Sequence, residues 1–471
     1  MNRILLSIIC FFVSVGIFSQ KLATQNFVNS PMFKRANIGV LVKNLDTDNV
    51  VAEYRSEKVC VPASTTKLVT TATALEMLSS DFQFKTNIEY DGKIVGKVLR
   101  GNLYITGGGD PTLGSKYMGD SLFLEKWISA IQMLGIEKIE GDIVADASIY
   151  NEQGISQKWM WEDMGNYYAA ATYGLSIFDN TCLVTFRSGE SGTLTEIIQK
   201  QPDIKSMQIS NHVKAAKQGG DKAYFFGAPL DNWRSVYGTI PENKEKFVSK
   251  ADIANPPLVV AQLLFDEIQK IGIQITGSPK TNFWKSNLSR VPIYSIFSPS
   301  LFEICKNINF KSNNHYAEHV YRYLAIADTI DRPDMCVSAQ VIKQFWKEKG
   351  LDVSGLLQND GSGLSPVNAI SAKFFVDLLE YEKKSSANFD KFYETLPLAG
   401  ETGTVKRLLK GTRLQGKVHC KSGSLSRVIC FAGYVEWKNQ TYAFSIMVNN
   451  YEGTYVAARA EIEKFLLTIF K

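Results

Sequence analysis

Ser64 and Lys67 are the first residues of the chain whose types and spacing could do chemistry. They form a Ser-x-x-Lys pattern at the start of a helix-patterned segment with apolar residues at 68, 72, 75 and 78. One helical turn puts i and i+3 on one face, so the Lys67 amine can take the Ser64 proton, provided that burial lowers the pKa of the amine. A serine at a helix start also offers an unpaired N–H to an oxyanion. Alone the pattern is weak, because chance matches are common.

Ser312 and Asn314 form a second pattern, Ser-x-Asn, in front of a helix-patterned segment at 315–321. The serine hydroxyl can relay a proton between nucleophile, lysine and leaving amine, and the asparagine amide can hold a substrate carbonyl. Another Ser-x-Asn, Ser386-Ala387-Asn388, lies in a polar break. We interpret that second copy as a loop.

Lys421-Ser422-Gly423-Ser424 forms a third pattern, beside a predicted strand at 429–435. It predicts a strand edge that carries a cation. The Lys421 ammonium and the Ser422 hydroxyl could fix a terminal carboxylate, and Gly423 would allow a close approach of substrate to the backbone.

In this order the three patterns resemble the active-site motifs of penicillin-binding proteins and serine β-lactamases. Ser64 and Ser312 are 248 positions apart, which leaves room for an inserted domain. Such an insert is similar to that of the low-molecular-mass class C penicillin-binding proteins, the D-alanyl-D-alanine carboxypeptidase/endopeptidase family. The resemblance runs from about residue 35 to the C-terminus and includes the stretches 107–113, 159–163, 314–318, 360–365 and 396–400.

The resemblance implies roles for the motif residues. Ser64 would be acylated, Lys67 and Ser312 would move protons, and Asn314 and Lys421 would position substrate. The N–H groups of Ser64 and Ser424 would form the oxyanion hole, and the hydroxyls of Ser422 and Ser424 would hold the carboxylate. Ser422 replaces a commoner threonine and Asn313 a common aspartate, and both keep suitable chemistry.

Recognition of the stem-peptide side chain is the part that departs from the family. An arginine of several members is replaced here by Pro366. The acidic residue that the family uses for an ammonium of that side chain is matched by Glu162 or Asp163, and the sequence leaves the choice between them open.

The resemblance implies an α/β (α+β) penicillin-binding/β-lactamase-like transpeptidase fold, an antiparallel sheet flanked by helices with a large β-rich insertion. Strand and helix patterns at both chain ends, the hairpin at 38–54 and the hairpin and helix at 430–470, fit one sheet. We expect residues 21–85 and 289–471 to form the peptidase domain. We expect 86–288 to hold two smaller β-rich domains, one nested in the other.

The N-terminus predicts export. A basic residue precedes an almost unbroken apolar run at 4–18, typical of a signal peptide over 1–20. The alternative, a retained membrane anchor, stays open, as do peripheral membrane contact and the oligomeric state. We expect a periplasmic or cell-envelope protein that acts on peptidoglycan stem peptides and binds β-lactams, with no cofactor. The net charge of +5 is spread along the chain and predicts no nucleic-acid partner.

Two other functions were weighed. His315, Glu318 and His319 fit the H-x-x-E-H pattern of inverted zinc peptidases, since i and i+4 share a helix face. The family's own alanine and glutamate after Ser-x-Asn explain this segment without a metal, so we expect no metal site. A serine β-lactamase on the same fold is the other alternative. We also considered that Cys420 and Cys430 could face each other across a hairpin.

Overall fold

The computed structural model describes residues 20–471 except 329, 332 and 334. The predicted signal peptide therefore lies almost wholly outside the described residues. The chain divides into two compact units, each made of separate segments. Of the described residues, those within 20–80, 301–313 and 339–471 form the first unit, and those within 81–300 and 314–338 form the second.

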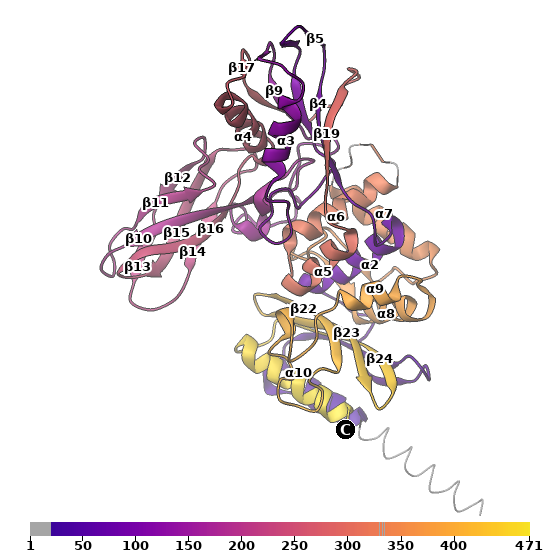
Figure 1. The fold of residues 1–471 in the computed structure, drawn as a ribbon. Helices are drawn as coiled ribbons and strands as arrows, with labels where there is room; N and C mark the ends of the chain where they lie inside the picture. The colour runs from indigo at the N-terminus through magenta and orange to yellow at the C-terminus, as the bar shows by residue number, and fades with distance from the viewer. Residues whose placement is uncertain (1–19, 329, 332, 334) are drawn as a thin grey trace, which may run out of the picture. The chain divides into compact units, whose positions relative to one another are not determined.

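The first unit is built on a five-stranded antiparallel sheet from both ends of the chain, in the order β2-β1-β24-β23-β22. Figure 1 shows α10 on one side of this sheet and α8 and α9 on the other. These elements confirm the two predicted hairpins and the C-terminal helix. The strands are β1 (Asn37–Asn44), β2 (Val50–Tyr54), β22 (Val418–Leu425), β23 (Val428–Trp437) and β24 (Gln440–Asn449).

Turn chemistry sets the register of both hairpins. The Asn44 side chain accepts hydrogen bonds from the N–H groups of Asp46 and Thr47, which closes the turn between β1 and β2. Lys438 and Asn439 have φ of 51° and 59°, as a two-residue hairpin turn requires. In the resulting register Cys420 lies opposite Gly433, and Cys430 opposite Gly423. The idea that the two cysteines face each other is therefore wrong, and both are free thiols.

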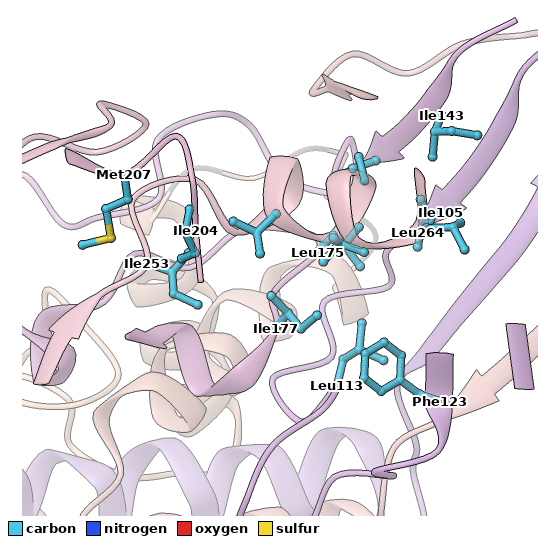
Figure 2. Packing of buried hydrophobic residues seen from close by; sticks show 14 of the residues in the cluster. Ile105, Leu113, Phe123, Ile143, Leu175, Ile177, Ile204, Met207, Ile253 and Leu264 are labelled. Carbon is cyan, nitrogen blue, oxygen red and sulfur yellow. The ribbon is translucent and has the colours of Figure 1, made fainter. Parts of the chain in front are cut away.

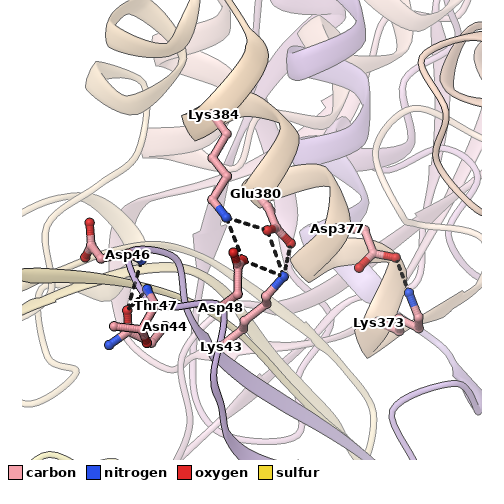
Figure 3. A network of polar contacts seen from close by, with 9 residues as sticks. All are labelled: Lys43, Asn44, Asp46, Thr47, Asp48, Lys373, Asp377, Glu380 and Lys384. Atoms are coloured by element: carbon pink, nitrogen blue, oxygen red, sulfur yellow. Dashed lines mark hydrogen bonds and ion pairs between the residues drawn. The ribbon is translucent and has the colours of Figure 1, made fainter.

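Alternation along these strands gives the sheet an apolar face against α10 and the helical residues 20–28. Ile38, Val40 and Val42 lie in one buried cluster with Phe465 and Leu466 of α10. The opposite face contacts α8, which an ion-pair network also ties to the turn between β1 and β2 (Figure 3). In that network the Lys43 ammonium lies 2.6 Å from the Glu380 carboxylate.

Helices and short strands complete the first unit. They are α2 (Thr66–Leu78), α5 (Leu301–Lys311), α7 (Met335–Glu348), α8 (Ala372–Ser385), α9 (Phe389–Glu394), α10 (Tyr455–Ile469), β3 (Val59–Cys60), β20 (Leu356–Leu357), β21 (Ala369–Ser371), and the 3₁₀ turns η1 (Pro31–Phe33), η2 (Ala63–Thr65) and η5 (Gly403–Val405). Helix α7 begins in the second unit. The three short strands form a small antiparallel sheet.

The second unit contains four small sheets around one apolar cluster, part of which Figure 2 shows. Its first part and its last part share two sheets, β17-β8-β6-β5 and β18-β9-β7-β4-β19. The elements are β4 (Lys85–Tyr90), β5 (Lys93–Val95), β6 (Val98–Arg100), β7 (Leu103–Thr106), α3 (Phe123–Gln132), β8 (Lys138–Ile139), β9 (Ile143–Asp146), α4 (Pro256–Lys270), β17 (Gln274–Ile275), β18 (Pro279–Asn282) and β19 (Val291–Phe297).

Between those parts the chain makes two further sheets, β11-β10-β16 and β12-β15-β13 with β14 paired to β15. The elements are η3 (Tyr167–Ala169), η4 (Phe178–Asn180), β10 (Thr181–Ser188), β11 (Glu196–Gln201), β12 (Gln208–Asn211), β13 (Lys214–Ala216), β14 (Lys222–Phe226), β15 (Trp233–Pro241) and β16 (Lys244–Asp252). Helix α6 (Asn314–Ala327) also belongs to this unit. The predicted domain boundaries stay a prediction.

Candidate active site

Ser64 lies in η2 and Lys67 in the first turn of α2, as the sequence pattern predicts. The Lys67 side-chain nitrogen donates to the Ser64 hydroxyl at 3.1 Å and to the Ser362 carbonyl at 2.6 Å. Lys67 is fully buried while Ser64 is partly exposed. The serine is thus open to a substrate, and the lysine that contacts it is shielded from water.

Lys421 and Ser312 form a second contact in the same unit. The Lys421 ammonium donates to the Ser312 hydroxyl at 3.0 Å and to the Ser422 carbonyl at 2.7 Å. Burial, and then the positive charge of Lys67, hold the pKa of Lys421 well below its usual value of 10.5. Strand β22, which carries Lys421, contacts η2, which carries Ser64. The four residues therefore form one cluster, which we call the Ser64 cluster.

The edge strand β22 packs directly on the segment that carries Ser64. A methyl group at Gly423 would come within 2.4 Å of the Pro62 carbonyl oxygen and 3.1 Å of the Ser64 backbone nitrogen. Only glycine lets the strand approach so closely. The Ser422 hydroxyl donates to the Thr404 hydroxyl at 2.8 Å, and Ser424 is exposed. The predicted strand edge is confirmed, and Thr404 is a contact that the sequence motifs do not predict.

Two residues of this site have left-handed backbone conformations. Ala63 has φ of 47° and Ser312 has φ of 55°. Ser312 directly follows α5, where a helix often ends in glycine. Such a conformation costs a non-glycine residue about 1–3 kcal/mol, and this kind of strain concentrates at functional sites.

The loop at 358–368 positions Lys67. The buried Asp360 carboxylate accepts from the N–H groups of Gly363 at 2.8 Å and Ser365 at 2.6 Å, and from the Asn368 amide at 2.8 Å. Gly363 has φ of 79°, and a methyl group there would meet the Ala63 carbonyl at 1.9 Å. Asp360 thereby folds the loop that presents the Ser362 carbonyl to Lys67. The sequence resemblance covers this stretch but predicts no role for Asp360 or Ser362.

The helix α5 is fixed to α2 by a buried amide. Asn309 of α5 donates to the hydroxyls of Thr71, at 3.1 Å, and Thr395, at 2.9 Å. Ser312 follows within one turn of Asn309, so this contact sets its position relative to Ser64. The second Ser-x-Asn pattern, at 386–388, lies in the link between α8 and α9, where Ser386 donates to Glu76. It takes no part in the Ser64 cluster.

The predicted substrate residue Asn314 begins α6 and lies in the second unit, whereas Ser312 lies in the first. The Asn314 amide donates to the Tyr168 carbonyl at 2.8 Å. Glu162 is exposed and Asp163 is partly buried in the same segment. Burial raises the pKa of Asp163, and the charge of Glu162 adds to this, while the Tyr168 hydroxyl acts in the opposite direction.

The structure does not favour the zinc alternative. The His319 Nδ1 must donate to the Gly109 carbonyl, at 2.7 Å, and its Nε2 contacts the Ser176 hydroxyl at 3.1 Å. Both ring nitrogens are therefore engaged in hydrogen bonds, and burial lowers the pKa of His319 to about 3. Within the described part of the chain no group of three His, Cys, Asp or Glu residues is placed to hold a metal ion.

Helix α6 is anchored to the rest of the second unit by further polar contacts. The Tyr316 hydroxyl lies 3.0 Å from the Asp179 carboxylate and 2.6 Å from the Ser115 hydroxyl, and Arg322 donates to the Thr172 carbonyl at 2.7 Å. The segment that follows the Ser-x-Asn motif is thus held by the insertion. This function of the insertion could not be read from the motifs.

Within the first unit, a helical Ser-x-x-Lys, the serine that follows α5 and a lysine on the edge strand of a five-stranded antiparallel sheet come together. Comparison with known proteins identifies the family. Residues 20–467 match the model of the D-Ala-D-Ala carboxypeptidase 3 (S13) family, and the chain belongs to this family. The predicted family, fold class and carboxypeptidase function are confirmed, and these findings favour the carboxypeptidase over the two alternatives.

Individual relatives cover most of the chain. It is 27% identical over 431 residues to D-alanyl-D-alanine carboxypeptidase DacB of Haemophilus influenzae, with 88% of this chain and 86% of the relative covered. It is 24% identical over 441 residues to a D-alanyl-D-alanine carboxypeptidase of an Actinomadura species, with 90% and 80% covered. The crystal structure of penicillin binding protein 4 from Haemophilus influenzae matches with a TM-score of 0.79 at 25% identity, covering 91% of this chain and 94% of that one.

Proposed function

We propose that Ser64 is the nucleophile with which this carboxypeptidase cleaves D-alanyl-D-alanine ends of peptidoglycan stem peptides. The observation that carries the proposal is the Ser64 cluster, in which Lys67 contacts Ser64 at 3.1 Å and Lys421 contacts Ser312 at 3.0 Å. A nucleophile within hydrogen-bond reach of a buried amine is the arrangement that serine activation needs.

In the proposed reaction Ser64 Oγ attacks the carbonyl carbon of the penultimate D-alanine, and Lys67, as the neutral amine, takes the hydroxyl proton. The N–H groups of Ser64 and Ser424 stabilise the oxyanion. The C–N bond then breaks, and the Ser312 hydroxyl relays the proton that Lys67 took to the leaving D-alanine amine. Water hydrolyses the acyl-enzyme in the second half. Cleavage of D-alanyl cross-links would use the same steps.

Substrate binding is assigned to groups that flank this cluster. Lys421 and the hydroxyls of Ser422 and Ser424 would hold the terminal carboxylate, and a bound carboxylate would favour the protonated form of Lys421. Gly423 would let the peptide lie along β22. We keep Asn314 as the residue that holds a substrate carbonyl.

The finer features of the family stay part of the proposal. Glu162 or Asp163 would bind an ammonium group of the stem-peptide side chain, although Pro366 stands where several members have an arginine. The enzyme would be exported and would bind β-lactams at Ser64. A relative, penicillin binding protein 4 from Haemophilus influenzae, is known in complex with a β-lactam. No helix among the described residues is long and apolar enough to cross a membrane.

Purified cross-linked and uncross-linked muropeptides, digested with the full chain and analysed by mass spectrometry, test the proposal. Loss of one D-alanine from the uncross-linked substrate is expected. Unchanged substrate in both digests would contradict it. Labelled penicillin separates the proposal from a β-lactamase, because a peptidase keeps the label on Ser64 whereas a β-lactamase releases it within seconds.

A further inference from the structure

The sheet of β12, β15 and β14 in the second unit has one face of exposed aromatic rings (Figure 1 shows these strands together). Strand register puts Tyr224 of β14 directly opposite Tyr237 of β15, and the two side chains are 51% and 49% exposed. Trp233 lies four residues before Tyr237 on β15, so its side chain points to the same side of the sheet. It is 55% exposed. We call this surface the aromatic face.

Neighbouring rings extend this face on both sides. The exposed His212 ring stacks on Tyr237 with centroids 4.6 Å apart and an angle of 9° between the planes. Phe226 lies edge-on to Tyr237 at 5.9 Å, and the exposed Trp161 lies 6.5 Å from Phe226. So many solvent-exposed rings on one small sheet mark a binding surface rather than a folding requirement.

The other outward residues of the aromatic face are polar. Ser235 and Thr239 alternate with the rings on β15, and Gln208 pairs with Trp233 from β12. The aliphatic side chains of these strands point inward to the buried cluster. Of the described residues on the outward positions of β12 to β15, the charged ones are Lys214 and Lys222, both cationic.

Sugar rings have the matching chemistry. A pyranose has an apolar C–H face that packs on an aromatic ring and a polar rim of hydroxyl and acetamido groups that hydrogen-bonds to serine, threonine and glutamine. Tyrosine and tryptophan supply such contacts at low cost in side-chain entropy. The cationic residues suit a polymer whose attached peptides carry free carboxylates.

Hydrogen bonds connect the aromatic face to the motif residue Asn314 within the second unit. The Asn166 amide bonds both the N–H and the carbonyl of Phe225 in β14, at 3.0 and 3.1 Å. It also donates to the carbonyls of Glu162 and Asp163. Two residues further on, the Tyr168 carbonyl accepts from the Asn314 amide at 2.8 Å. The segment at 161–168 thus joins the face to a proposed substrate residue.

We propose that the aromatic face binds the glycan strand of peptidoglycan. This proposal deepens the proposed function and rests on it for the identity of the polymer. The ligand class is a β-linked N-acetylhexosamine saccharide. The insertion then selects polymeric wall over free peptides.

Calorimetric titration of the full chain with peptide-free glycan strands, prepared from sacculi with an amidase, tests this binding. The double variant Tyr224→Ala/Tyr237→Ala should bind about tenfold more weakly, the usual loss when central interface aromatics are truncated. The control Trp284→Ala removes a tryptophan that is 65% exposed two residues after β18, away from this face, and should bind like the wild type.

Activity measurements separate the two proposals. In the double variant kcat/KM should stay unchanged on a soluble acyl-L-Lys-D-Ala-D-Ala peptide and should fall on intact sacculi through a higher KM. No binding of glycan strands by the wild type, or equal binding by the double variant, would overturn the saccharide site. A concentration-dependent dimer of the wild type that the double variant abolishes would also overturn the saccharide site, because the aromatic face would then be a dimer interface. If the wild type binds strands but never cleaves the soluble peptide, the proposed catalytic function fails instead.

Discussion

The Ser64 cluster and the aromatic face differ in how their residues come together. Ser64, Ser312 and Lys421 reach the cluster from separate segments of the first unit, and both of its lysines are fully buried. The aromatic face takes its central rings from two paired strands, and all of them contact solvent. A buried cluster assembled from distant segments depends on many positioning contacts that a mutation can remove. An exposed row of rings on paired strands depends on few such contacts. We therefore expect the two regions to respond very differently to substitution.

Ser64→Ala should have the largest effect, because it removes the group that forms the acyl-enzyme. Turnover of a soluble D-Ala-D-Ala peptide should fall by about 10⁴-fold or more. The same variant should take up no covalent penicillin label. Ser426→Ala, which changes an exposed serine between β22 and β23, is the matched control and should retain both activities. Residual labelling of the Ser64 variant would assign the nucleophile to another residue.

Ser312→Ala should come next. It removes the hydroxyl that contacts Lys421 at 3.0 Å, and with it the proposed proton relay, so kcat should fall by about 10²- to 10³-fold. Ser386→Ala alters the other Ser-x-Asn copy, which lies outside the Ser64 cluster, and should leave kcat near the wild-type value. Equal losses in the two variants would mean that Ser312 contributes only to stability.

Asp360→Asn tests whether residues that position the Ser64 cluster affect activity as much as the residues in the cluster do. The change leaves the side chain with one fewer acceptor for the N–H groups of Gly363 and Ser365, so the loop that carries the Ser362 carbonyl should shift. We expect kcat to fall by about 10- to 100-fold with little change in KM, because small displacements of catalytic groups cost this much. Asp352→Asn, in an exposed turn, is the control.

Lys421 should give the site an alkaline limit. Its pKa in the folded enzyme lies below 10.5, so the ammonium loses its proton at a lower pH than a free lysine does. Substrate carboxylate binds to the protonated form, and KM should therefore rise by up to about tenfold per pH unit above that pKa. A substrate amidated at its C-terminus should show no such rise. A KM independent of pH up to 10.5 would contradict carboxylate binding by Lys421.

The contrast between the two regions also explains how far the sequence could be interpreted. The motifs at Ser64 and Lys421 predict side-chain chemistry, and the structure brings both to one cluster with Ser312. The Ser362 carbonyl is a backbone atom, so its residue type carries no signal for its contact with Lys67. Thr404 is ordinary in sequence, and only the packing of η5 on β22 brings it to Ser422.

Fold class could be predicted because the strand and helix patterns of both chain ends are regular. The unit to which α6 belongs could not be predicted. The spacing of its apolar residues shows that the helix packs against other elements, but not in which unit these elements lie. The aromatic face was readable in principle, since Tyr224 and Phe226, like Trp233 and Tyr237, alternate along strands. Alternation alone does not say which side of a strand faces solvent, and the buried Val236 and Phe225 settle this only in the structure.

Trp233→Ala should have the smallest effect and gives the sharpest contrast with the cluster. The side chain is 55% exposed, so its loss should change the free energy of unfolding by less than about 0.5 kcal/mol. Trp127→Ala, at a fully buried tryptophan of the same unit, should cost about 3–5 kcal/mol because it leaves a cavity in the apolar cluster. Denaturant unfolding of both variants measures the difference. Turnover of the soluble peptide by Trp233→Ala should remain within twofold of the wild type. A large loss of stability would show that the aromatic face is part of the core of its sheet, and would remove the argument that its rings are kept for binding.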